Sequence, residues 1–224
     1  MDTGIPIPVD LDPQSLAENI MADYLVLDIG GVLVDLGGMM KLQVWTGHDP
    51  ERIKELWLGC DAVRKFESGR IGYMEFADSL ITEFNLPLDA GQLEIEMKHW
   101  VSEFFTGAHE LLEHLGKHYK LVCLCNTNEL QWPVIRDKLS SNFTHQFISH
   151  EIGMVKPDSE IYKHVTEQLG VASESLHYFD DSMPNVEAAR AQGWKAFQVK
   201  GLEDLRSNLK TLGFLHEHRS GDQA

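Results

Sequence analysis

Short runs of hydrophobic residues recur along the chain, and the first three are each followed by polar or glycine-rich residues and then by a segment with helical spacing. Four runs are clear and a fifth is weaker: residues 24–27, 121–124, 176–179, 194–199 and, more weakly, 146–149. Short apolar runs that alternate with helices are typical of a parallel sheet covered on both faces. The pattern therefore predicts an α/β fold.

Two segments between these runs have the spacing of amphipathic helices. Residues 108–118 carry three leucines on one face. Residues 159–169 place apolar side chains at helical intervals and are followed by Gly170, a typical helix stop. We expect both segments to cover the sheet.

The stretch from about residue 39 to residue 105 follows a different pattern. It contains no good strand, and it has helical segments over residues 50–58, 74–84 and 93–104. About 65 mostly helical residues are far more than a crossover between two strands needs. We expect an inserted helical subdomain over the carboxyl ends of the strands, where open α/β sheets bind ligands.

These patterns together predict the organisation of the whole chain. The parts, in order, are an N-terminal extension (1–23), an α/β core (24–38 and 106–215), an inserted all-helical cap (39–105) and a disordered tail (216–224).

The charge of the chain argues against nucleic acid as a partner. Lys and Arg number 19 and Asp and Glu number 35 among 224 residues, so the formal net charge is −16. Such a field repels a phosphate backbone. Hydrophobic residues make up 43% and charged residues 24%, as in ordinary globular proteins.

Other features indicate a cytoplasmic protein without a membrane partner. No uninterrupted apolar stretch approaches the roughly 20 residues that span a bilayer. The first residues lack a basic start and are interrupted by prolines and aspartates, unlike a signal peptide. The three cysteines (Cys60, Cys123 and Cys125) are expected to be buried free thiols, which fits a reducing compartment. The sequence does not indicate an oligomeric state.

Chemically reactive residues follow three of the apolar runs. Asp28 is followed by Gly30 and Gly31, Cys125 by Asn126, and Asp180-Asp181 by Asn185. Lys156 lies between the second and third of these groups, in a glycine-bearing loop. Because the ends of parallel strands converge on one edge of a sheet, Asp28, Lys156 and Asp181 are expected to meet there.

Such a meeting has specific chemistry. Neighbouring carboxylates repel each other unless a cation neutralises them, and Mg²⁺ binds one or two carboxylates while leaving positions for water and phosphate. With the metal and Lys156, the pocket becomes an anion site in an acidic protein. An aspartate beside a bound phosphoryl group can attack it, which gives an acyl phosphate that water hydrolyses.

Each feature alone also has an ordinary structural explanation, and these explanations stay open. Asp28 can cap a turn, Asp180-Asp181 can be an acidic loop, Gly30-Gly31 can serve only a tight turn, and Lys156 can be a surface lysine. The four features together, each beyond an apolar run or in a glycine-bearing loop, favour a functional site. Arg64, Lys65 and Arg70 in the helical stretch are expected to be solvated charges, although they can reach the pocket.

At these residues the sequence resembles the haloacid dehalogenase-like (HAD) hydrolase superfamily, over residue 24 to about residue 212. The resemblance implies that Asp28 is the nucleophile, that Cys125 and Asn126 hold the phosphate-binding position, and that Lys156 before Pro157 stabilises the phosphoaspartate. Among the other residues, it implies metal ligation by Asp28, the Gly30 carbonyl and Asp181, support of the metal site by Asp180 and Asn185, and phosphate binding by Gly31.

The resemblance also implies a Rossmann-like parallel sheet flanked by helices, with a helical cap. Residues 66–71 followed by Phe76 resemble a feature of that cap. Within the superfamily, the chain resembles sugar phosphatases of the glucose-1-phosphatase type and the phosphatase domain of soluble epoxide hydrolase. The implied activity is that of a Mg²⁺-dependent phosphatase acting on a small phosphorylated metabolite such as a sugar phosphate.

Two positions depart from the family pattern. Gly30 stands where a phosphatase of this kind has a second aspartate as general acid and base, although some relatives also have glycine there. Cys125 replaces a phosphate-binding hydroxyl, and a thiol is a weak donor. Thr127 or backbone N–H groups are possible replacements.

Two alternative functions follow from these observations. The first is a carbon–halogen hydrolase, in which the same aspartate attacks carbon without a metal, but Asp180 and Asp181 would repel an acidic substrate. The second is a metabolite-binding protein with impaired catalysis, which the departures at Gly30 and Cys125 motivate.

Overall fold

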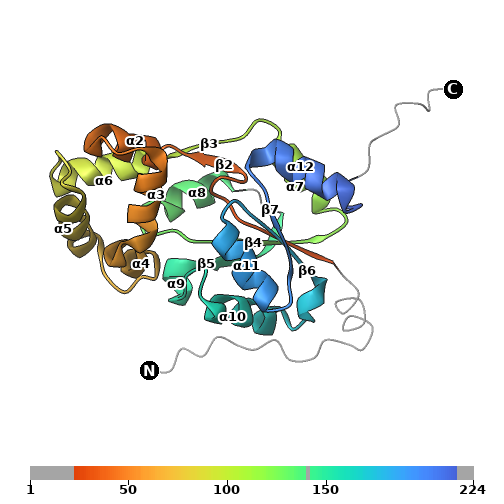
Figure 1. Ribbon diagram of the computed structural model, residues 1–224. Helices are drawn as coiled ribbons and strands as arrows, with labels where there is room; N and C mark the ends of the chain where they lie inside the picture. The colour runs from red at the N-terminus through yellow and green to blue at the C-terminus, as the bar shows by residue number, and fades with distance from the viewer. Residues whose placement is uncertain (1–22, 140–141, 216–224) are drawn as a thin grey trace.

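The computed structural model describes residues 23–139 and 142–215, and Figure 1 shows their arrangement. The predictions for residues 1–22 and for the tail 216–224 lie outside the described residues. A five-stranded parallel sheet with the order β5-β4-β1-β6-β7 forms the centre of the molecule. Its strands, in chain order, are β1 (Tyr24–Leu27), β4 (Lys120–Cys125), β5 (Phe143–Ile148), β6 (Leu176–Asp180) and β7 (Lys195–Gln198). The predicted Rossmann-like α/β fold is confirmed.

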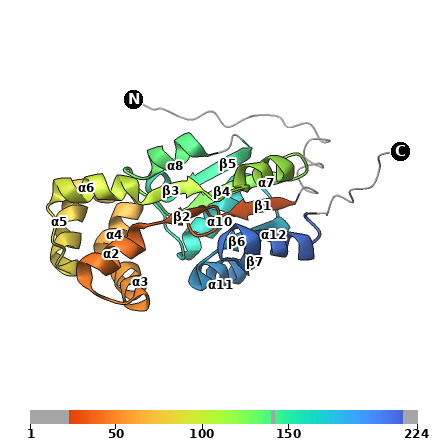
Figure 2. The ribbon, with the colours of Figure 1, turned by 90° about the horizontal axis from the view of Figure 1, so that it is seen from above.

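Helices cover both faces of this sheet, as Figures 1 and 2 show. The first face is covered by α7 (Ala108–Leu115), α8 (Trp132–Lys138) and α12 (Gly201–Thr211), and the second by α10 (Ser159–Leu169) and α11 (Met183–Ala191). Leu25 and Leu27 of β1 contact the first hydrophobic cluster, whereas Val26 between them contacts the second. This alternation follows from the two-residue period of a strand. It explains why β1 is apolar throughout.

A helical segment lies beyond the carboxyl ends of the strands, at the left in Figure 1. It consists of α2 (Gly38–Thr46), α3 (Pro50–Gly59), α4 (Asp61–Glu67), α5 (Tyr73–Phe84) and α6 (Ala90–His99). These helices have a hydrophobic cluster of their own, in which the rings of Phe66 and Phe76 stack with centroids 4.3 Å apart. None of the described helices is both long and apolar enough to cross a membrane.

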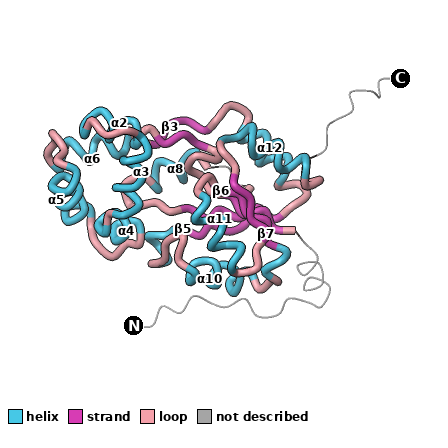
Figure 3. The backbone as a smooth tube through the Cα atoms, viewed as in Figure 1, coloured by secondary structure: helices cyan, strands magenta, loops and turns pink. Residues whose placement is uncertain are grey.

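A two-stranded antiparallel sheet connects the helical segment to the core, and Figure 3 shows it apart from the main sheet. It pairs β2 (Val34–Leu36) with β3 (Val101–Phe104). The expectation that residues 39–105 contain no strand was therefore wrong, and the helix expected over 93–104 ends at His99. The strand forms because its backbone groups are satisfied by β2, a distant partner, and the Gly37 N–H extends the pairing by donating to the Trp100 carbonyl.

The remaining described elements are short. They are α9 (Ser149–Ile152), which follows β5 directly, and a 3₁₀ helix (Ser173–Ser175) before β6. β5 leads directly into α9, and β4 is paired in parallel with both β5 and β1. The segments that follow β4 and β5 therefore lie at the same edge of the sheet as Asp28.

Candidate functional site

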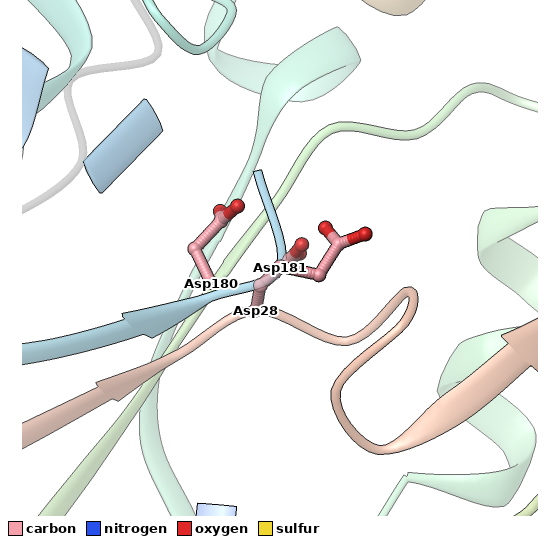
Figure 4. A group of neighbouring side chains, drawn as sticks. All are labelled: Asp28, Asp180 and Asp181. Carbon is pink, nitrogen blue, oxygen red and sulfur yellow. The ribbon is translucent and has the colours of Figure 1, made fainter. Parts of the chain in front are cut away.

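Three aspartates lie together at the carboxyl edge of the sheet (Figure 4). Asp28 follows β1, Asp180 is the last residue of β6, and Asp181 follows it. The strands pair in parallel with Leu27 opposite Phe179, and the Asp28 N–H donates to the Phe179 carbonyl at 3.0 Å. One carboxylate oxygen from each aspartate lies within 4.8 Å of the others. The predicted approach of Asp28 to Asp181 is therefore observed.

Lys156 lies buried beside two of these carboxylates. Its Nζ is 3.0 Å from Asp28 Oδ1 and 2.8 Å from Asp180 Oδ2, and it donates to the Leu124 carbonyl at 3.1 Å. Burial alone would lower the pKa of Lys156, but the two carboxylates raise it well above its usual value. The lysine is therefore a fixed positive charge at the site, rather than one of the surface lysines that the sequence left open.

Several hydrogen bonds fix the carboxylate of Asp180. Its carboxylate accepts from the hydroxyl of Tyr178, from the Ser182 N–H at 2.8 Å and from Asn185 Nδ2 at 3.0 Å. Burial favours the neutral form, but Lys156 and these donors hold the pKa of Asp180 below its usual value. Asp180 thus orients Lys156 and Asn185 and remains ionised.

Asp28 and Asp181 differ from Asp180 in their electrostatics. Burial raises the pKa of Asp28 to about 8 although Lys156 opposes this, and the charges of Asp180 and Asp181 add to the rise. Burial and the charge of Asp180 also raise the pKa of Asp181, against Lys156 and Lys54. A divalent cation between these carboxylates would favour their ionised forms.

Gly31 brings the chain close to Asp181. Its φ of +70° is in the left-handed region, and a Cβ at this position would lie 2.7 Å from Asp181 Oδ2. Its N–H donates to the Val34 carbonyl at 2.8 Å, and Gly30 forms a bridge with Val34 in the same turn. The turn therefore requires glycine at position 31, and the N–H of Gly31, a residue expected to bind phosphate, has a partner within the turn.

Cys125 and Asn126 follow at the end of β4. Cys125 is buried in the first hydrophobic cluster, and burial with the nearby charge of Asp28 raises its thiol pKa well above the usual value. Asn126 Oδ1 accepts from the Lys156 N–H at 2.9 Å, and its Nδ2 donates to the Lys156 carbonyl at 3.0 Å. The Asn126 side chain thus fixes the backbone of Lys156.

Thr127 carries a buried hydroxyl without a hydrogen-bond partner among the described residues. Its backbone is fixed, because the Thr127 N–H donates to Ser149 Oγ at 2.9 Å and Ser149 Oγ donates to the Thr127 carbonyl at 3.0 Å. A buried hydroxyl without a partner is costly, so a ligand atom that binds it would be stabilising.

Sequence reasoning missed one acidic residue beside these groups. Glu67, at the end of α4, has its Oε2 3.5 Å from Asn126 Nδ2. Of the three basic residues expected to be solvated charges, Arg64 pairs with Asp158, and Lys65 pairs with Asp61 at 2.7 Å. The segment 66–71 resembled a cap feature, but nothing in its pattern shows that Glu67 reaches the core.

Comparison with known proteins links this geometry to one family. Residues 73–199 match the model of the haloacid dehalogenase-like hydrolases. A D-ribitol-5-phosphate phosphatase of Bacteroides thetaiotaomicron is 21% identical over 203 residues, which cover 86% of this chain and 98% of that protein. A phosphatase of Mycobacterium tuberculosis is 29% identical over 192 residues, covering 77% of this chain and 88% of that protein.

Solved structures agree with the fold. A HAD family enzyme of Bacteroides thetaiotaomicron, in complex with magnesium and inorganic phosphate, matches with a TM-score of 0.65 and 25% identity, over 80% of this chain and 94% of the other. A predicted HAD-like hydrolase of Porphyromonas gingivalis matches with a TM-score of 0.68 and 21% identity, over 88% and 100% of the two chains.

Proposed function

Because the chain belongs to the haloacid dehalogenase-like hydrolase family, we propose that it is a Mg²⁺-dependent phosphatase that hydrolyses a small phosphorylated metabolite. The observation that carries the proposal is the meeting of Asp28, Asp181 and Lys156 at the carboxyl edge of the sheet. A buried nucleophile, an acidic cluster and a fixed ammonium are the groups that transfer of a phosphoryl group to aspartate requires.

The acidic cluster fits a hard divalent cation. Carboxylate oxygens within 4.8 Å of one another are a typical donor set for Mg²⁺. Asp28, Asp181 and the Gly30 carbonyl would hold the ion, and Asp180 and Asn185 would keep the cluster in place. When bound, the ion supplies positive charge that offsets the negative charge of the carboxylates and the phosphoryl group. The magnesium complex of the Bacteroides thetaiotaomicron relative supports this assignment.

In the proposed reaction, an Asp28 oxygen attacks phosphorus and the bond to the leaving oxygen breaks. Water then attacks the phosphorus of the aspartyl phosphate and regenerates the carboxylate. Lys156, which is already fixed between Asp28 and Asp180, stabilises negative charge on the phosphoryl oxygens. Cys125, Asn126 and Gly31 border the phosphoryl group in this proposal. The Thr127 hydroxyl, which has no hydrogen-bond partner within 23–139 and 142–215, supports a further contact with it.

The helical segment is proposed to act as a cap (39–105) over the core (24–38 and 106–215) and to select the substrate. A phosphorylated sugar or sugar alcohol is the proposed class, which the ribitol-5-phosphate phosphatase among the relatives supports. A reducing, cytoplasmic setting is part of the proposal, and the three buried free cysteines support it.

The replacement of Asp28 by Asn tests the nucleophile. We expect Asp28→Asn to reduce the release of phosphate from p-nitrophenyl phosphate by at least about 10⁴-fold, because an amide oxygen does not form the acyl phosphate. Circular dichroism and thermal unfolding check that the variant is folded. Undiminished turnover in a folded variant would remove Asp28 from the mechanism.

A further inference from the structure

We propose that Glu67, at the end of α4, is the general acid and base of the reaction and does the work of the second aspartate that Gly30 replaces. This inference rests on the proposed phosphatase function and adds to it the source of the proton for the leaving group.

Two contacts hold the end of α4 beside the strand ends. Gly69, just after the helix, lies so close to α9 that a Cβ there would be 2.4 Å from the His150 carbonyl oxygen. Arg64, one turn before the end of α4, pairs with Asp158, two residues after Lys156. Glu67 lies between these two anchors in sequence, and its carboxylate therefore faces the core loops.

A continuous series of contacts leads from Glu67 to the nucleophile. Glu67 Oε2 is 3.5 Å from Asn126 Nδ2, and the Asn126 side chain makes two hydrogen bonds with the backbone of Lys156. Lys156 Nζ is in turn 3.0 Å from Asp28 Oδ1. This series of contacts places the Glu67 carboxylate against Asn126, beside the loop that carries Lys156 and on the side of the helical segment.

The leaving oxygen of the substrate is expected on the side of the helical segment. In phosphoryl transfer the attacking and leaving oxygens lie roughly in line on opposite sides of phosphorus. Asp28 attacks from the sheet edge, so the leaving oxygen points away from the sheet toward the helical segment. An acid on α4 is therefore on the correct side to give it a proton.

The surroundings of Glu67 suit a group that both gives and takes a proton. Burial raises its pKa to about 7, although Lys156, Asn126, Arg64 and Trp57 all favour the ionised form. Burial keeps the nearby thiol of Cys125 neutral, because it raises the pKa of that thiol well above its usual value. Near neutral pH both forms of Glu67 are populated, as an acid in the first step and a base in the second require.

The proton balance is complete with this residue. In the first step Asp28 forms a bond to phosphorus, the bond from phosphorus to the leaving oxygen breaks, and the Glu67 proton passes to that oxygen. In the second step the Glu67 carboxylate takes a proton from water as the water oxygen bonds to phosphorus. The bond from phosphorus to Asp28 then breaks, which leaves alcohol, phosphate and the original enzyme.

Two aryl phosphates test this role with the variant Glu67→Gln, which keeps the shape of the side chain. Phenyl phosphate has a poor leaving group that needs a proton, whereas 2,4-dinitrophenyl phosphate has a good one that does not. We expect kcat/KM, which reports the first step, to fall by about 10²-fold or more for phenyl phosphate and by less than about tenfold for the dinitrophenyl ester. The decline of kcat/KM for phenyl phosphate above about pH 7 should also disappear.

The exposed Glu75, in the first turn of α5, supplies the matched control, since Glu75→Gln removes a solvent-exposed acid of the same helical segment. Glu75→Gln should leave kcat/KM unchanged for both esters. Equal losses on both substrates, or no loss on either, in Glu67→Gln would overturn the role of Glu67. An absence of turnover by the wild type on either ester would instead count against the proposed phosphatase function.

If Glu67→Gln does not fold, the pH dependence of kcat/KM of the wild-type protein still tests the role of Glu67. The pH profile of the wild type should decline above about pH 7 for phenyl phosphate and not for the dinitrophenyl ester, because only the first needs the Glu67 proton. Identical profiles for the two esters would contradict the assignment.

Discussion

Gly31 shapes the candidate metal site although it has no side chain. It has a left-handed backbone conformation, and Asp181 occupies the space where a Cβ would lie. The position thus needs glycine for two separate reasons, backbone conformation and the space for a carboxylate.

These two reasons can be separated by comparison with Gly153, which has a φ of +75°. Apart from its chain neighbours, no atom of the described residues lies within 4 Å of a Cβ built there. We expect Gly31→Ala and Gly153→Ala each to lose about 1–2 kcal/mol of unfolding free energy from backbone strain. Only Gly31→Ala should also weaken Mg²⁺ binding, because its methyl group displaces Asp181. Urea unfolding and calorimetric titration with Mg²⁺ measure the two effects, and equal Mg²⁺ affinities in the two variants would contradict the expectation.

The sequence predicted that Asp28 and Asp181 lie together, but it did not indicate the position of Glu67. Asp28 and Asp181 follow apolar runs, and the convergence of parallel strand ends was enough to predict that they meet. Glu67 reaches the core only because α4 rests on α9 and on the loop after Lys156. Such packing between distant segments leaves no local pattern in the sequence.

At the scale of elements, strands and helices that bury their own apolar side chains were predictable. The run at Tyr24–Leu27 and the helix at Ser159–Leu169 have the predicted bounds. The strand at Val101–Phe104 was missed because β2 stabilises it. The first half of β5, before the predicted run at 146–149, was missed because Thr144 and His145 are exposed at the sheet edge, and polar residues there carry no strand signal.

The junction of α4 and α5 is a second element whose stability is testable. Phe76 is fully buried and stacks on Phe66, next to Glu67. We expect Phe76→Ala to lower the unfolding free energy by about 3–5 kcal/mol through the cavity it leaves, and to raise KM because α4 loosens. Met74→Ala, an exposed position on the same helix, should change stability by less than about 0.5 kcal/mol. Urea unfolding measures both, and similar losses in the two variants would count against a packed junction.

At the scale of the whole molecule, Mg²⁺ should act as a stabilising ligand. Mg²⁺ at about 100 times its Kd should raise the unfolding free energy by about 2.7 kcal/mol, because it binds the folded state and relieves repulsion among Asp28, Asp180 and Asp181. Thermal unfolding with and without EDTA measures this, with NaCl at matched ionic strength as the control because the chain carries a net charge of −16.

Removal of Mg²⁺ with EDTA also distinguishes a phosphatase from a carbon–halogen hydrolase. A phosphatase of the proposed kind loses activity in EDTA and regains it with excess Mg²⁺, whereas attack of an aspartate on a carbon–halogen bond needs no metal. Hydrolysis of 2-chloropropionate that persists in EDTA would contradict the proposed function.

The position of β1 in the middle of the sheet has a consequence for how the protein is made. Tyr24 pairs on one side with Lys120 and on the other with Leu176, partners that the ribosome adds about a hundred and about a hundred and fifty residues later. During synthesis, β1 therefore lacks both of its neighbouring strands until residues 120–125 and 176–180 have emerged from the ribosome. The carboxylate cluster of Asp28, Asp180 and Asp181 therefore cannot form before residue 181 has been synthesised.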